Sequence, residues 1–177
     1  FGHAIDGLVS MVGPIGSVSS VVSTQVKEWT ASDTGDKASV TAPDNILVSG
    51  LLKSGGAFSV HIGSIAAVGT GYHLQIHGSK GTITLEASGS THNGEGLLRV
   101  AIEGGSELRE TTAPQAEWVV AAGLQGAPVN IGKLWESYAA SILDGSEFHP
   151  DFDDAVEHHK LVDAIQLASD SGQVQRV

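Results

Sequence analysis

The sequence predicts an α+β domain: an open, mostly antiparallel sheet with helices on one face and the other face available for oligomerisation. Three observations support this fold class. Apolar and polar residues alternate through the middle of the chain, helical spacing occurs near both ends, and Gly-rich turns separate the segments. A meander of neighbouring antiparallel strands accounts for the alternating part.

A helix is expected over residues 1–13, with its apolar side chains on one side. The opposite, polar stripe consists of His3, Asp6, Gly7 and Ser10. Gly13 and Pro14 end this helix, and the β-branched run 17–26 predicts a strand. Residues 30–40 are rich in Ser, Thr, Asp and Gly, which predicts a loop.

Strands joined by glycine turns are expected in the middle of the chain. The clearest pair is 72–77 with 82–86, because both segments alternate and Gly78–Gly81 supplies the turn. Similar patterns predict the other strands, over residues 46–52, 57–65, 97–103 and 107–112.

Two helices and a short strand are expected near the C-terminus. In the first helix, apolar residues with helical spacing are Ile131, Leu134, Trp135, Tyr138 and Ile142. Asn130 is its expected N-cap and Gly145 its stop. The second helix is expected from about Asp153 to Ser169, and residues 174–177 form the final strand.

One face of the predicted sheet carries small or polar side chains without the Lys and Glu density of a solvated surface. These residues are Ser59, His61, His73, Gln75, His77, Thr82 and Thr84. We therefore expect a homo-oligomer that associates through this face.

Composition limits the classes of partner and compartment. The 177 residues are 41% hydrophobic, which suits a single domain over residues 1–177. Nine Lys and Arg against 20 Asp and Glu give a net charge of -11, which argues against nucleic acid and anionic membranes as partners. The chain has no cysteine and no apolar run long enough to span a bilayer, so we expect a soluble, cytoplasmic protein.

Two groups of residues that include histidines are candidate metal ligands. His61, His73 and His77 share the polar face, but no carboxylate or thiol is expected to alternate into it. The second group, around a helix start, consists of His149, Asp151, Asp153, His158 and His159. Its acidic residues suit the helix dipole, and adjacent helical residues diverge, so one of His158 and His159 should pack on the core and the other face solvent. We predict no metal site.

His3 has a more informative setting. By position alone, a histidine in the first helical turn is more often a surface residue than a catalyst. Here it shares a stripe with Asp6 and Gly7, and such a stripe can face a ligand. No glycine-rich phosphate-binding loop occurs in the sequence, so we predict no cofactor-binding residues in this chain.

Several segments resemble, in order, the C-terminal domain of the glucose-fructose oxidoreductase / inositol dehydrogenase (Gfo/Idh/MocA) family. They are Gly2–Asp6, Thr41–Asp44, Gly50–Gly55, Gln75–Ile83 and Pro150–Ile165. The Thr-Ala-Pro-Asp segment and the Phe-x-Asp-Ala-Val-x-x-His segment are closest to the branch similar to the fungal galactose-regulon repressor. No single motif is specific, and the resemblance rests on the order of the set.

This resemblance implies an N-terminal Rossmann domain, absent from this chain, that binds NAD or NADP. The domain in hand would shape the substrate pocket and supply an oligomerising sheet. His3 matches a histidine that handles the substrate proton, so it is the expected catalytic residue, with Asp6 and Gly7 supporting the substrate side. The substrate would be a sugar, inositol or related polyol, and the chain alone is not expected to be active.

Two other functions remain open from the sequence. One is a non-catalytic regulatory protein of the same fold that senses a sugar or nucleotide. The other is a free-standing dimerisation module.

Overall fold

A computed structural model describes residues 1–64, 68–89, 96–112, 123–124 and 126–177. The chain forms two compact units, one of residues Phe1–Ala67 with His149–Val177 and one of Val68–Phe148. Helices and antiparallel strands occur in both units, which confirms the α+β class. Among the described residues, no helix combines the length and apolar composition needed to cross a bilayer.

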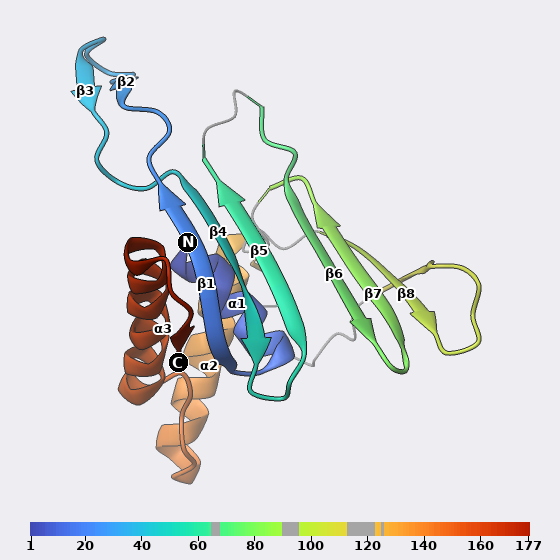
Figure 1. Ribbon diagram of the computed structural model, residues 1–177. Helices are drawn as coiled ribbons and strands as arrows, with labels where there is room; N and C mark the ends of the chain where they lie inside the picture. The colour runs from blue at the N-terminus through green and yellow to red at the C-terminus, as the bar shows by residue number, and fades with distance from the viewer. Residues whose placement is uncertain (65–67, 90–95, 113–122, 125) are drawn as a thin grey trace. The chain divides into compact units, whose positions relative to one another are not determined.

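The first unit is a four-stranded antiparallel sheet with two helices on one face (Figure 1). Its strands lie in the order β10 (Gln175–Arg176), β1 (Ile15–Ser23), β4 (Asn45–Leu52) and β5 (Ala57–Gly63). The helices are α1 (Gly2–Val12) and α3 (Phe152–Ser171). The chain therefore returns at its end to cover and extend the sheet that it began.

Helix α3 packs directly on β1. Both elements contribute to the buried apolar core, which consists of Ile5, Leu8, Ile15, Val18, Val48, Leu161, Ile165 and Ala168. Two hydrogen bonds join the same elements: the hydroxyl of Ser20 donates to the carbonyl of Ile165, and the amide of Val22 donates to Ser169 Oγ at 2.9 Å. This contact fixes the helical layer on the sheet.

A small ribbon stands beyond the ends of β1 and β4 (Figure 1). Strand β2 (Glu28–Thr30) pairs with β3 (Lys37–Ser39), and Lys37 Nζ lies 2.7 Å from Glu28 Oε1. The sequence predicted a loop over residues 30–40. That prediction was wrong at the edges of the segment, because each strand is too short to show an alternating pattern against the surrounding turn residues.

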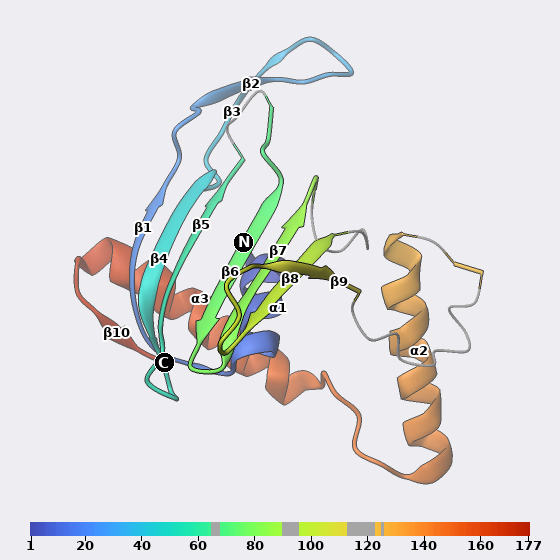
Figure 2. The same cartoon turned by 90° about the vertical axis from the view of Figure 1, so that its right-hand side faces the viewer.

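The second unit contains a separate four-stranded sheet (Figure 2). Its strands are β6 (Tyr72–Gly78), β7 (Gly81–Ala87), β8 (Leu97–Ile102) and β9 (Arg109–Thr111), in that order and all antiparallel. The hairpins expected here are thus confirmed. The sequence predicted one sheet, whereas the described strands form two four-stranded sheets and the two-stranded ribbon, because alternation identifies strands but not which strands pair.

Helix α2 (Ala127–Asp144) also belongs to the second unit. Its stop at Gly145 is confirmed, but Asn130 is not the N-cap: the N-cap is Gly126, four residues earlier, with Pro128 in the first turn of the helix. Its apolar stripe is exposed, with 63% of Trp135 and 65% of Ile142 accessible. Helical spacing therefore predicted the helix but not its burial.

Asp44 closes the base of the ribbon. It is buried, and its two carboxylate oxygens accept hydrogen bonds from the amides of Gln25 at 2.7 Å and Val26 at 2.8 Å. Burial raises the pKa of this carboxyl, but the two backbone N–H donors and the nearby Lys27 outweigh that effect, so the net pKa is lowered. The ionised form therefore stabilises the fold above the ordinary pKa of 3.8, and that contribution is lost as the pH falls through the lowered value.

Replacing Ile5 should destabilise the first unit strongly. Ile5 is fully buried, with 0% of its surface exposed, so Ile5→Ala leaves a cavity and should lower the free energy of unfolding. We expect a loss of about 2–5 kcal/mol in urea unfolding followed by circular dichroism. The control is Met11→Ala on the same helix, where 49% of the side chain is exposed and little change is expected. Equal losses in the two variants would contradict this packing.

Replacing Asp44 should alter the dependence of stability on pH. Asp44→Asn keeps the side-chain size but removes the charge that the two amides stabilise, so the unfolding temperature at neutral pH should fall. The variant should also lose less stability than the wild type between about pH 5 and pH 3, measured by thermal melts across that range. Asp36→Asn, in the exposed turn of the ribbon, is the control. Parallel pH curves for wild type and Asp44→Asn would rule out this role.

Candidate functional site

The polar stripe predicted for the first helix lies on the exposed side of α1. His3, Asp6 and Ser10 are exposed and Gly7 is half-buried, whereas Ile5 and Leu8 point into the core. Packing of the apolar side on the core therefore turns the stripe outward. The N-cap residue Phe1 makes no side-chain cap bond, so the helix start depends on its neighbours for its position.

One such neighbour is His158 of α3. Its Nδ1 lies 3.8 Å from Asp6 Oδ1, and only 23% of its side chain is exposed, against 72% for Asp6. A Cβ on Gly2 would stand 3.4 Å from His158 Nε2. His159, next along the helix, is exposed as expected for one of the pair, while His158 is half-buried beside α1.

Space is open beside Gly7. A Cβ built on Gly7 would meet no described atom within 4 Å, and the hydroxyl of Ser10 donates to the Gly7 carbonyl at 2.9 Å. The room could accept a ligand or another domain. The catalytic role of His3 and the supporting roles of Asp6 and Gly7 stay predictions.

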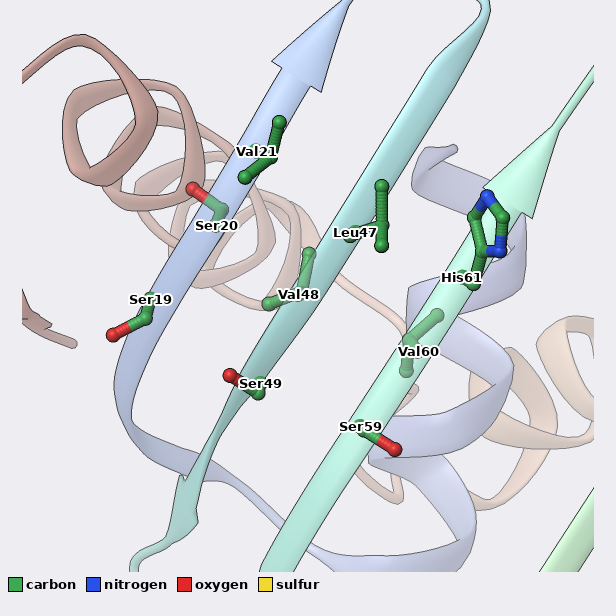
Figure 3. Close-up of a pocket in the computed structure, with 9 residues that line it drawn as sticks. All are labelled: Ser19, Ser20, Val21, Leu47, Val48, Ser49, Ser59, Val60 and His61. Atoms are coloured by element: carbon green, nitrogen blue, oxygen red, sulfur yellow. The ribbon is translucent and has the colours of Figure 1, made fainter. Parts of the chain in front are cut away.

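The uncovered face of the first sheet contains a shallow hollow of about 400 Å³ (Figure 3). Strand register arranges its outward residues in rows: Ser19, Ser49 and Ser59 form one, and Val21, Leu47 and His61 form the next. Neither row contains a charged Asp, Glu, Lys or Arg. Gly50 of β4 needs to be glycine, because a Cβ there would collide with the carbonyl of Ser17 on β1.

The three histidines weighed as a metal group each contact an oxygen of a neighbouring residue. His61 Nε2 lies 2.9 Å from Asn45 Oδ1, His73 Nε2 lies 3.0 Å from the Thr70 carbonyl, and His77 Nδ1 lies 3.3 Å from Thr82 Oγ1. The expectation that no carboxylate shares the polar face was wrong. Register places Glu86 directly opposite His73, and its Oε2 lies 3.3 Å from Arg99 Nη1.

His149, Asp151 and Asp153 of the second histidine group lie at the N-terminal cap of α3, whereas His158 and His159 lie further along the helix. Asp151 accepts from the amides of Asp153 at 2.8 Å and Asp154 at 3.0 Å, while Asp154 Oδ2 accepts from the Asp151 amide at 2.9 Å and lies 2.7 Å from His149 Nδ1. The hydrogen bond from His149 lowers the pKa of Asp154, with help from the Asp151 amide. Ligand atoms of His149, Asp151 and Asp154 lie within 4.8 Å of one another, but helix capping already accounts for this arrangement.

Some contacts could not be found from the sequence. The spacing of the stripe on α1 was readable, but its approach to His158 joins residues far apart in the chain. The row of three serines depends on the register of β1, β4 and β5, which alternation alone does not fix.

The first half of the chain matches a known family. Residues 1–87 match the profile described as Gal80p, C-terminal domain. No curated protein matches the chain.

Solved structures share the fold over nearly the whole chain. The transcriptional regulator Gal80p from Kluyveromyces lactis is 21% identical with a TM-score of 0.77, covering 99% of this chain and 44% of its own. An NAD-binding oxidoreductase from Klebsiella pneumoniae is 18% identical with a TM-score of 0.77, covering 99% and 49%. Levoglucosan dehydrogenase, in complex with NADH and L-sorbose, is 21% identical with a TM-score of 0.74, covering 99% and 49%. The chain thus spans just under half the length of each, and the predicted resemblance is confirmed for the fold.

Proposed function

We propose that this chain is the C-terminal domain of an NAD(P)-dependent oxidoreductase that acts on a sugar, inositol or related polyol. The observation that carries the proposal is the exposed stripe of His3, Asp6 and Gly7 on a domain with the fold of sugar oxidoreductases. The cofactor would be NAD or NADP, held mainly by an N-terminal domain. The cytoplasm is the proposed location, in keeping with the absence of cysteine.

The chemistry fits an imidazole at this position. Oxidation of an alcohol breaks its O–H and C–H bonds, and the pair of electrons leaves carbon as hydride while a C=O bond forms. A nicotinamide ring accepts the hydride when the cofactor is bound. His3 accepts the hydroxyl proton, since a neutral imidazole is a base near neutral pH. Asp6, one turn further on, supports the substrate side of the helix, and the space at Gly7 lets the substrate approach the backbone.

A second candidate function is regulatory. The match of residues 1–87 to the Gal80p C-terminal domain favours a protein that kept the fold, binds a sugar or nucleotide and acts on a protein partner without turnover. A free-standing dimerisation module is a third. Nicotinamide binding without oxidation of any polyol would favour the regulatory function, and a complete gene product without a nucleotide-binding domain would favour the module.

Activity of the complete gene product that carries this chain tests the main proposal. NADH or NADPH formation should be followed with a panel of sugars, inositols and polyols. His3→Ala should lower kcat/KM by about 10²–10⁴-fold through loss of the general base. His159→Ala, an exposed histidine on α3, is the matched control and should keep wild-type activity. Equal activity of His3→Ala and wild type would remove His3 from the mechanism.

We also propose that two copies associate through the uncovered face of the first sheet. Small side chains in the serine row allow close approach, and exposed apolar residues flank them, with 57% of Val21 and 42% of Leu47 accessible. A surface that is partly apolar and uncharged in these rows is unusual for a chain with a net charge of -11. Self-association would remove it from water.

Light scattering and sedimentation of the chain at micromolar concentration test this association. Ser49→Arg places a cation at the centre of the face in both copies, so repulsion should raise the dimer Kd by about 100-fold or more. Ser54→Arg, in the exposed turn between β4 and β5, is the control and should leave the dimer intact. A monomeric wild-type chain, or a dimer insensitive to Ser49→Arg, would exclude this face.

A further inference from the structure

His158 occupies a position that its place in the sequence does not suggest. It belongs to α3, but its ring lies beside the first two turns of α1: Nδ1 lies 3.8 Å from Asp6 Oδ1, and Nε2 would stand 3.4 Å from a Cβ on Gly2. Gly2 and Asp6 are four residues apart and therefore one turn apart. One ring nitrogen thus lies near residue 2 and the other near residue 6, and His3 lies between these two positions in the sequence.

The two helices differ in how firmly their starts are held. Helix α3 has a reciprocal capping box between Asp151 and Asp154, and three of its residues, Leu161, Ile165 and Ala168, are buried. Helix α1 has no side-chain cap at Phe1 and no acidic residue in its first turn. The start of α3 is therefore held by its own cap, whereas the uncapped first turn of α1 takes its position from what it packs against.

We propose that His158 is a positioning residue that sets the rotation of the first turn of α1 and thereby the direction of His3. The functional part of this inference rests on the proposed oxidoreductase activity. Side chains project from the surface of a helix, so even a small rotation of the helix about its axis displaces them. The ring lies close to Asp6 and to the position that a Gly2 Cβ would take, one turn apart, and so opposes that rotation. His158 acts through the helix and touches no reacting atom.

The contact works mainly by shape. At 3.8 Å the pair exceeds hydrogen-bond length, and Asp6 is largely exposed, so solvent screens its attraction for the ring. The half-buried imidazole, by contrast, fills the space between the helices beside Gly2. A Cβ at position 2 would already stand in van der Waals contact with the ring, so a branched side chain there should press on it.

Nuclear magnetic resonance of the ¹⁵N-labelled 177-residue chain tests the positioning role without catalysis. His158→Ala removes the wedge and should shift the imidazole signals of His3 and the amide signals of residues 2–6. His158→Asn places an amide nitrogen near the position of Nδ1, so it should restore part of the wild-type spectrum. His159→Ala, on the adjacent exposed residue, should leave these signals in place.

Gly2→Val tests the same contact by a change on α1 instead of α3. Its added methyl groups should push on Nε2 and shift the His158 ring signals, even if His158→Ala folds poorly. Wild-type His3 signals in a folded His158→Ala, or equal shifts in His159→Ala, would overturn the proposal. So would an unchanged His158 ring in Gly2→Val.

Kinetics of the complete gene product separate this inference from the proposed function. His158→Ala should lower kcat by about 10- to 100-fold with KM nearly unchanged, because misorientation of His3 affects the reacting geometry more than binding. Shifted His3 signals in a protein without oxidoreductase activity would retain the positioning role and refute the function. Wild-type kcat in His158→Ala, with active enzyme, would refute the positioning role and retain the function.

Discussion

The packing of α3 on β1 is the constraint on which the rest of the first unit depends. The hydroxyl of Ser20 on β1 donates to the carbonyl of Ile165 on α3, and these residues are 145 positions apart in the chain. Helix α1 then packs against α3, and its buried residues Ile5 and Leu8 determine which side faces outward. Core packing therefore turns the polar stripe outward, and the contact proposed for His158 acts only on the first turn of the helix.

Local patterns predicted most of the elements because each has a physical period. Alternation identified the hairpin of β6 and β7, helical spacing identified α2, and start and stop signals identified α3. The errors arose where an element was too short to show its period or where a stronger local signal was present. Strands β2 and β3 have three residues each, and Pro128 moved the start of α2 upstream of Asn130. Burial was harder still: Trp135 follows the apolar pattern of α2 and yet is exposed, because spacing says nothing of whether a partner lies against the stripe.

Only the part of the candidate site formed by residues close together in the sequence could be predicted. His3, Asp6 and Gly7 could be placed on one stripe from spacing, since residues three and four apart share a helical face. His158 could not be added, because its contact with Asp6 crosses from one end of the chain to the other. Register was likewise beyond reach: it aligned Ser19, Ser49 and Ser59 in one row and brought Glu86 opposite His73 on the second sheet. Both are properties of pairing, which a single strand does not encode.

The carboxylate of Asp44 makes the ribbon an independent appendage. This carboxylate accepts hydrogen bonds from the amides of Gln25 and Val26, just after β1 ends. The contact between the two chain segments at the sheet is therefore complete before the ribbon begins. The entropy cost of a closed loop grows only with the logarithm of its length, so the segment beyond this clasp can lengthen or shorten with little penalty to the sheet. Evolution, or an engineer grafting a recognition loop, can vary that tip freely while the architecture beneath it stays the same.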